Sequence, residues 1–196
     1  MFNSATLNRR ATLLDDKREV IGAALLFLGK DPNSIDETDL AEAKKVIDGW
    51  KKNITKFENE QYKNGISSKE FHLVMGYSGD LVQVIQDNPH VGFAIPAEGT
   101  TMSCDVMCIP TTAKNTELAY KFINFIHQPA NAAANTEYVF FLCPNESSYA
   151  LLSEGIKNNP AVFIDPEIFK KSRFMKDHGE KEVILNKLWE NIKSEK

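Results

Sequence analysis

The residues with the clearest chemistry are a tyrosine and an aspartate three positions apart, Tyr77 and Asp80. The alternating residues 70–75 before them and the apolar-periodic residues 81–85 after them are typical of a strand, a tight turn and a helix. Ligands of open α/β sheets bind beyond the strand ends, and an aromatic face beside a carboxylate favours an organic cation. In the alternative interpretation, Asp80 and Ser78 only satisfy the first amides of the helix and Tyr77 is half packed.

Other acids occupy turn or loop-end positions of the same kind. Asp16 and Glu19 follow a short apolar run and begin a helical pattern, and Asp105 lies at the start of a later predicted strand. If one sheet aligns these turns at one edge, the carboxylates converge. Converging acids suit a ligand with separated ammonium groups, whose methylenes need an apolar or aromatic wall. The structural alternative for Asp16 and Glu19 is a capping box, since they have its three-residue spacing.

Composition and motifs exclude several function classes. The 196 residues carry a net charge of -4, which disfavours nucleic acid as a partner and is better suited to cationic ligands. Apolar runs such as residues 21–28 are too short to cross a membrane, and the N-terminus lacks the regions of a signal peptide. No nucleotide-binding, serine-hydrolase or zincin motif occurs. A small α/β enzyme using Asp16 and Glu19 as an acid-base pair is therefore the weaker hypothesis.

The cysteines and histidines do not form a recognisable site. The three cysteines, Cys104, Cys108 and Cys143, are an odd number and include no CxxC pair, so buried thiols are predicted. A Cys104–Cys108 or Cys108–Cys143 disulfide is left open. The four histidines are scattered without metal-ligand spacing, and we expect no metal and no cofactor.

The elements that must position these residues alternate along the first half of the chain. Periodicity predicts strands around residues 6–14, 54–57, 70–75, 91–96 and 105–110. It predicts helices around residues 17–28, 40–50, 81–87, 118–126, 129–134 and 180–192, the fourth of them capped by Asn115 or Thr116. Strands that alternate with helices indicate an α/β fold, followed here by a mostly helical part.

Seven short motifs together resemble the spermidine/putrescine-binding proteins of bacterial ABC importers. They occur in the family's order over nearly the whole chain: Leu13–Val20, Leu28–Ser34, Met75–Asp80, Pro96–Gly99, Asp105–Met107, Ile109–Pro110 and Ala113–Asn115. The resemblance implies a non-enzymatic, periplasmic or lipid-anchored receptor with two lobes. Such a receptor closes on a polyamine in the cleft between the lobes and delivers it to a membrane permease.

The resemblance also implies roles for the acids and the tyrosine. Asp16 and Glu19 match the acidic pair of the second lobe that approaches the ligand ammoniums. Tyr77 stands where the family commonly has a tryptophan that packs on the methylene chain, and Asp80 matches an acid that follows it. Asp105 resembles an aspartate that binds an amine.

The walls of the implied cleft are less regular. Phe141 falls near an aromatic wall residue of the family, although two adjacent aromatics are usually core when considered alone. Ser103 stands where a large aromatic is often found, so the pocket wall is thinner and another cationic solute is an alternative cargo.

The implied fold is of the periplasmic-binding-protein type, with lobes divided near residue 105. Residues 1–105 would form the second lobe, a mixed sheet flanked by helices, and residues 106–196 the crossover strand and the helical returning segment of the first lobe. A family member would carry a signal peptide and much of the first lobe before Met1, so we expect a fragment. Its uncovered apolar face would be open to dimerisation or strand exchange. A ligand-free interaction or folding unit is the remaining alternative.

Overall fold

Three short parallel strands form the sheet that positions the candidate site. The computed structural model describes residues 1–195, in which β1 (Ala11–Leu13) lies between β2 (Ile54–Phe57) and β3 (Leu73–Val74). Ala11 pairs with Ile54 on one side and with Leu73 on the other. The α/β fold class is confirmed, and all of these strands pair in parallel where a mixed sheet was expected. Parallel pairing brings the carboxyl ends of β1 and β3 to the same edge.

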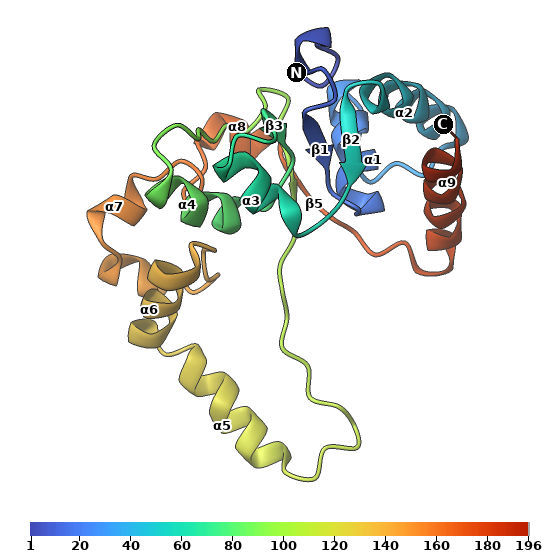
Figure 1. Cartoon of the computed structure of the whole chain (residues 1–196). Coiled ribbons are helices and arrows are strands. Elements are labelled where there is room, and N and C mark those ends of the chain that lie inside the picture. Colours follow the sequence, from blue (N-terminus) through green and yellow to red (C-terminus); the bar gives the residue numbers. More distant parts are fainter. Residues whose placement is uncertain (196) are drawn as a thin grey trace.

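Three helices pack together beside this sheet (Figure 1). They are α1 (Lys17–Phe27), α2 (Glu37–Lys51) and α9 (Glu182–Ser194). Helix α9 comes from the end of the chain and lies against both α1 and α2. Its buried Leu185, Trp189 and Ile192 join the same apolar cluster as the strands and the first two helices. One core is thus built from the two ends of the described chain.

A second, smaller core lies around α4 (Ser78–Asp87) and α6 (Pro129–Val139). Val82 of α4 contacts this cluster, while Leu81 belongs to the larger one. Helix α4 therefore bridges the two cores. The remaining helices of this region are α3 (Gln61–Ser67), α7 (Glu154–Lys157) and α8 (Pro166–Lys171). Short 3₁₀ helices cover Ala5–Leu7, Glu146–Leu151 and Gly179–Lys181.

A separate pair of strands joins distant parts of the chain. β4 (Thr101–Met102) pairs in parallel with β5 (Arg173–Phe174). Gly99, with φ of +100°, makes the turn before β4, and a Cβ there would lie 2.8 Å from the carbonyl carbon of Lys171. Only glycine allows the backbones to approach so closely at this conformation.

Two of the expected strands are not formed. Residues 91–96 belong to no strand, because no other strand lies alongside to accept their backbone hydrogen bonds. Residues 105–110 are also unpaired, since β4 ends at Met102 and the chain then leaves the protein surface. For this reason the prediction of buried thiols is wrong for Cys104 and Cys108, which are exposed. The three cysteines of the described chain are free.

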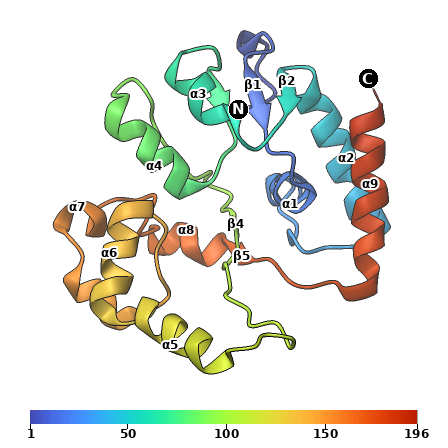
Figure 2. The same ribbon diagram turned by 60° about the horizontal axis from the view of Figure 1, so that its bottom comes forward.

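Helix α5 (Thr116–Ile126) projects from the rest of the protein at the end of that extended segment (Figures 1 and 2). Its predicted cap is confirmed, because the Leu118 amide donates to Asn115 Oδ1 at 2.9 Å. Four large apolar residues of this helix are exposed, namely Leu118, Tyr120, Phe122 and Phe125. Within residues 1–195, no helix combines the length and apolarity needed to cross a membrane.

Candidate functional site

Asp16 begins α1 and combines a structural contact with a free acceptor. Its Oδ1 accepts hydrogen bonds from the backbone amides of Arg18 at 2.8 Å and Glu19 at 3.2 Å. This confirms the predicted cap, which satisfies amides that have no partner inside the helix. Both bonds use the same oxygen, so Oδ2 is left for another partner.

Glu19 does not complete the capping box. Its Oε2 accepts a hydrogen bond from Thr101 Oγ1, which ties the first turn of α1 to β4. Gly22, one turn further along α1, permits this approach, because a Cβ there would lie 2.7 Å from Thr101 Cγ2. Burial raises the pKa of Glu19, the hydrogen bond from Thr101 lowers it, and the charge of Asp16 raises it further. The net shift is upward.

The charges of all the acids that the sequence singled out act on Tyr77. Burial raises the pKa of Tyr77 to about 12, and the charges of Asp16, Glu19, Asp105 and Asp80 add to the shift in that order. Each of these carboxylates is therefore close enough to act electrostatically on one phenol. The adjacent parallel strands β1 and β3 explain part of this arrangement, since Asp16 follows one and Tyr77 the other.

Asp80 is held by a tyrosine that the sequence did not indicate. Tyr62 donates its hydroxyl to Asp80 Oδ2 at 2.6 Å, and the Lys63 ammonium lies 3.6 Å from the same oxygen. Tyr62 is fully buried, with Gly76 so close that a Cβ would lie 2.6 Å from its ring. Residues 61–70 are mostly polar in sequence, so no local pattern distinguishes this ring. The proposed capping role of Asp80 is not observed, since the N-cap of α4 is Tyr77 and makes no side-chain cap bond.

Phe141 packs on the turn that carries Tyr77 and Asp80. A Cβ at Gly79 would lie 2.6 Å from two ring carbons of Phe141, so the ring rests directly on the first turn of α4. The ring is 43% exposed, whereas its neighbour Phe140 is buried in the smaller core. The structure thus separates two adjacent aromatics into a core residue and one at the candidate site.

Asp105 and Ser103 lie in the extended segment after β4, and both are exposed. Asp105 does not begin a strand, but its charge still reaches Tyr77. Ser103 supplies no aromatic ring to this side of the site. The structure consequently offers carboxylates from several segments around Tyr77, with Phe141 as a second ring.

Arg18 of α1 lowers the pKa of Glu19 through its charge, but its hydrogen bonds go to other partners. Arg18 donates to Glu182 at 3.3 Å, to Asn33 at 3.3 Å and to the carbonyl of Lys176 at 2.8 Å. Its guanidinium is therefore directed toward the start of α9. No group of side chains suited to a metal ion is found within residues 1–195. Carboxylates gathered around an aromatic ring suit organic ammonium groups, which form charge-assisted hydrogen bonds and cation–π contacts.

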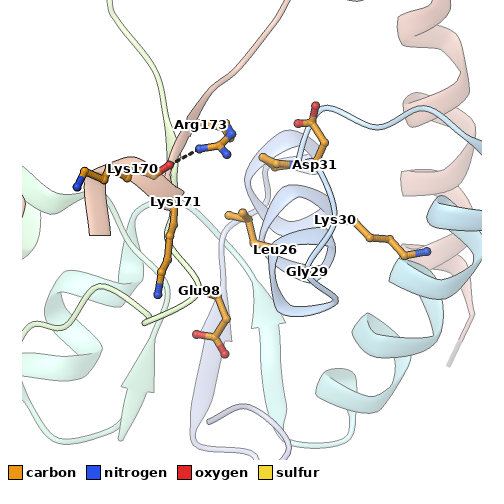
Figure 3. Close-up of a pocket in the computed structure, with 9 residues that line it drawn as sticks. Leu26, Gly29, Lys30, Asp31, Glu98, Lys170, Lys171 and Arg173 are labelled. Atoms are coloured by element: carbon orange, nitrogen blue, oxygen red, sulfur yellow. Dashed lines mark hydrogen bonds between the residues drawn. The ribbon is translucent and has the colours of Figure 1, made fainter. Parts of the chain in front are cut away.

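A cavity of about 260 Å³ lies at the other end of α1, between Leu26 and the C-terminal end of α8 (Figure 3). Its lining is mostly charged, but the cations already have partners. Lys171 donates to the carbonyl of Ala97 at 2.9 Å, and Arg173 donates to the carbonyl of Lys170 at 2.6 Å. This cavity contains none of the acids that converge on Tyr77 and is not the candidate site.

Comparisons with known proteins agree with a solute-binding fold. Residues 1–164 match the family model described as bacterial extracellular solute-binding protein. The chain is 29% identical over 193 residues to the putrescine-binding periplasmic protein PotF of Escherichia coli (strain K12), covering 94% of this chain and 52% of the relative. It is 31% identical over 203 residues to a putrescine/cadaverine-binding protein of Pseudomonas aeruginosa, covering 98% of this chain and 57% of the relative.

Solved structures give the same result. A spermidine/putrescine ABC transporter substrate-binding protein, PotD from Streptococcus pneumoniae, superposes with a TM-score of 0.82 and 27% identity. The match covers 98% of this chain and 60% of that structure. The chain spans about half the length of the curated relatives named above.

Proposed function

This chain belongs to the bacterial extracellular solute-binding protein family, and from that premise we propose that it binds a polyamine such as putrescine or spermidine for an ABC importer. The observation that carries the proposal is the convergence of acids on one aromatic ring. Asp16, Glu19, Asp105 and Asp80 all act on Tyr77. Catalysis by Asp16 and Glu19 is set aside, because the family binds solutes and Asp16 already caps α1.

The proposed ligand complements this arrangement in charge and shape. Its ammonium groups would donate to carboxylate oxygens, which gives bonds about twice as strong as those between neutral groups. The intervening methylenes would lie against the rings of Tyr77 and Phe141, which are both partly exposed. A flexible ligand with separated charges would thereby satisfy acids that stand on different segments of the chain.

We infer the wider organisation from the same family. Residues 1–105 would form the second lobe, and residues 106–196 the crossover and returning segment of the first, with the ligand in the cleft between lobes. Helix α9 is an exception to this division, because it belongs to residues 106–196 but packs on α1 and α2 of the second lobe. The protein would work outside the cytoplasm, as its periplasmic relatives do, and pass its ligand to a membrane permease.

Isothermal titration calorimetry with putrescine and spermidine tests the proposal. We expect the wild-type protein to bind at least one of them and Asp105→Asn to weaken binding at least about tenfold, because a charged partner of an ammonium is worth roughly 1.5–3 kcal/mol. Asp16→Asn should also weaken binding. Asparagine is as good an N-cap as aspartate, so the thermal midpoint of this variant should stay close to wild type.

The matched variant Asp16→Ala separates the two roles of this residue. It loses both the cap and the charge, so it should bind weakly and also lose about 0.5–2 kcal/mol of unfolding free energy. Unchanged affinity in both Asp105→Asn and Asp16→Asn would contradict the site assignment. Absence of any polyamine binding by the wild-type protein would contradict the function and favour a folding or interaction unit.

Another cationic solute is the second candidate. It is favoured by Ser103, which is exposed and places no ring beside Asp105. Mass spectrometry of small molecules released from the purified protein distinguishes the two. A co-purifying polyamine supports the first candidate, and a different organic cation supports the second.

A further inference from the structure

The acids around Tyr77 are not equivalent, because Asp80 has a cation of its own. The Lys63 ammonium lies 3.6 Å from Asp80 Oδ2, with the lysine side chain 37% exposed and the aspartate side chain 25% exposed. Lys63 stands on α3, and its ammonium also lies 6.0 Å from the centroid of the Tyr62 ring. A second acid near Lys63, Glu60, is 4.0 Å away and 86% exposed, so it is a weaker competitor for the lysine.

The same oxygen of Asp80 is fixed from two sides. Tyr62, a fully buried side chain, donates to Oδ2 at 2.6 Å, and Lys63 approaches that atom as well. These contacts leave Oδ1 for a ligand, but the charge of the carboxylate is already shared. Asp80 therefore attracts an incoming ammonium less strongly than its formal charge suggests.

Lys63 would also act on a ligand bound at Asp80. A positive charge beside the site repels each ammonium that binds within its range, and the repulsion grows with the number of ammoniums. Putrescine carries two such groups and spermidine three. With Lys63 beside Asp80, the third ammonium would meet both a partly neutralised acid and a like charge.

We propose that Lys63, which lies beside the Asp80 carboxylate that Tyr62 fixes, is a specificity-determining residue that favours diamines over triamines at this site. This inference rests on the proposed polyamine-binding function. It assigns the substrate class more narrowly than that function does, and it identifies a residue of α3 that no local sequence pattern indicated.

Calorimetry on the wild-type protein and on Lys63→Met tests the assignment, with putrescine and spermidine titrated into each. Methionine keeps an unbranched side chain of similar length and removes the charge. We expect the spermidine-to-putrescine affinity ratio to rise about threefold or more in Lys63→Met, because charges at partly exposed positions interact with energies near 1 kcal/mol. Lys63→Arg keeps the positive charge and should retain the wild-type preference.

Lys187→Met is the matched control, since Lys187 is an exposed lysine on α9. Its affinity ratio should equal that of the wild type, which excludes a general effect of net charge. An unchanged ratio in Lys63→Met, with both polyamines still bound, would overturn the specificity role and leave the proposed function intact. A wild-type protein that binds neither polyamine would overturn both, and the two failures are therefore distinguishable.

Discussion

Glu19 links ligand binding to pH at the scale of a single residue. Burial raises its pKa above the ordinary value of 4.5, so its proton is lost only at higher pH than for an exposed glutamate. An ammonium ligand needs the ionised form. On lowering the pH from neutrality, we expect affinity for putrescine to begin falling while ordinary glutamates are still charged. Calorimetry over a pH series measures this, and Glu19→Gln should show a weaker pH dependence together with weaker binding at neutral pH.

The same residue affects stability in the opposite direction. A raised native pKa means that the folded chain binds the proton more tightly than the unfolded chain. The stabilising contribution of Glu19 is thus fully present below pH 4.5 and is lost as the pH rises through the native pKa. As the pH rises from 4.5 through the native pKa of Glu19, the melting temperature of the wild type should accordingly fall relative to that of Glu19→Gln. A difference that is independent of pH would contradict the raised pKa.

Contacts of individual residues were predictable from the sequence only where they are local. The Asp16 cap follows from an aspartate just before a helical pattern. Its two partners, the amides of Arg18 and Glu19, are two and three positions further along the chain. Glu19 has the spacing of a capping box, but its carboxylate instead accepts a hydrogen bond from Thr101, which is 82 positions away. The contact between Tyr62 and Asp80 likewise depends on the packing of α3 against α4. Tertiary packing decided these cases against the local pattern.

At the scale of elements, the close packing of α4 against the end of α6 shapes the site. Helix α6 ends at Val139 and is followed by the C-cap residue Phe140, whose φ of 60° is left-handed. The chain then places Phe141 on Gly79. A Cβ at Gly79 would also lie 2.6 Å from the backbone oxygen of Val139, which cannot move as a side chain does. The first turn of α4 therefore requires glycine for packing.

Gly79→Ala should consequently disturb both stability and binding. We expect a loss of about 1–3 kcal/mol in unfolding free energy, typical of overpacking, and weaker polyamine binding because Phe141 must shift from its place on the first turn of α4. Denaturant unfolding and calorimetry measure the two effects. Gly155→Ala is the matched control, since its Cβ would meet only Ser153 Oγ at 3.8 Å in the short helix α7. A neutral Gly79→Ala variant would contradict the close packing.

Helices and strands were predictable where the periodic segment also has a cap or a neighbouring strand to complete its hydrogen bonds. Helices α1, α2, α4, α5, α6 and α9 and strand β2 correspond to predicted elements, and the Asn115 cap sets the start of α5. Helices α3, α7 and α8 were not predicted. Residues 91–96 and 105–110 have strand-like composition but remain unpaired, because a strand exists only when another backbone lies beside it. Composition indicates whether a segment favours the strand conformation, whereas the presence of a free sheet edge decides whether a strand forms.

At the scale of the whole molecule, the two ends of the chain hold each other while a middle segment is exposed. The Lys17 ammonium lies 3.1 Å from Glu182, and Lys193 lies 3.0 Å from Asp15. Trp189 also donates to Asp15 at 3.3 Å. Residues 103–115, in contrast, contain neither helix nor strand and are almost entirely exposed.

Limited proteolysis tests this arrangement, because proteases cut exposed and extended backbone first. Lys114 is the single trypsin site within residues 103–115, so the first cut should follow it and give pieces 1–114 and 115–196. The pieces should separate on a denaturing gel. They should elute together under native conditions, since β4 pairs with β5 and α9 packs on α1 and α2. Lys114→Gln should delay the cut. An earlier cut elsewhere would contradict the preferential exposure of residues 103–115. Pieces that separate without denaturant would show that α9 does not hold the two ends of the chain together.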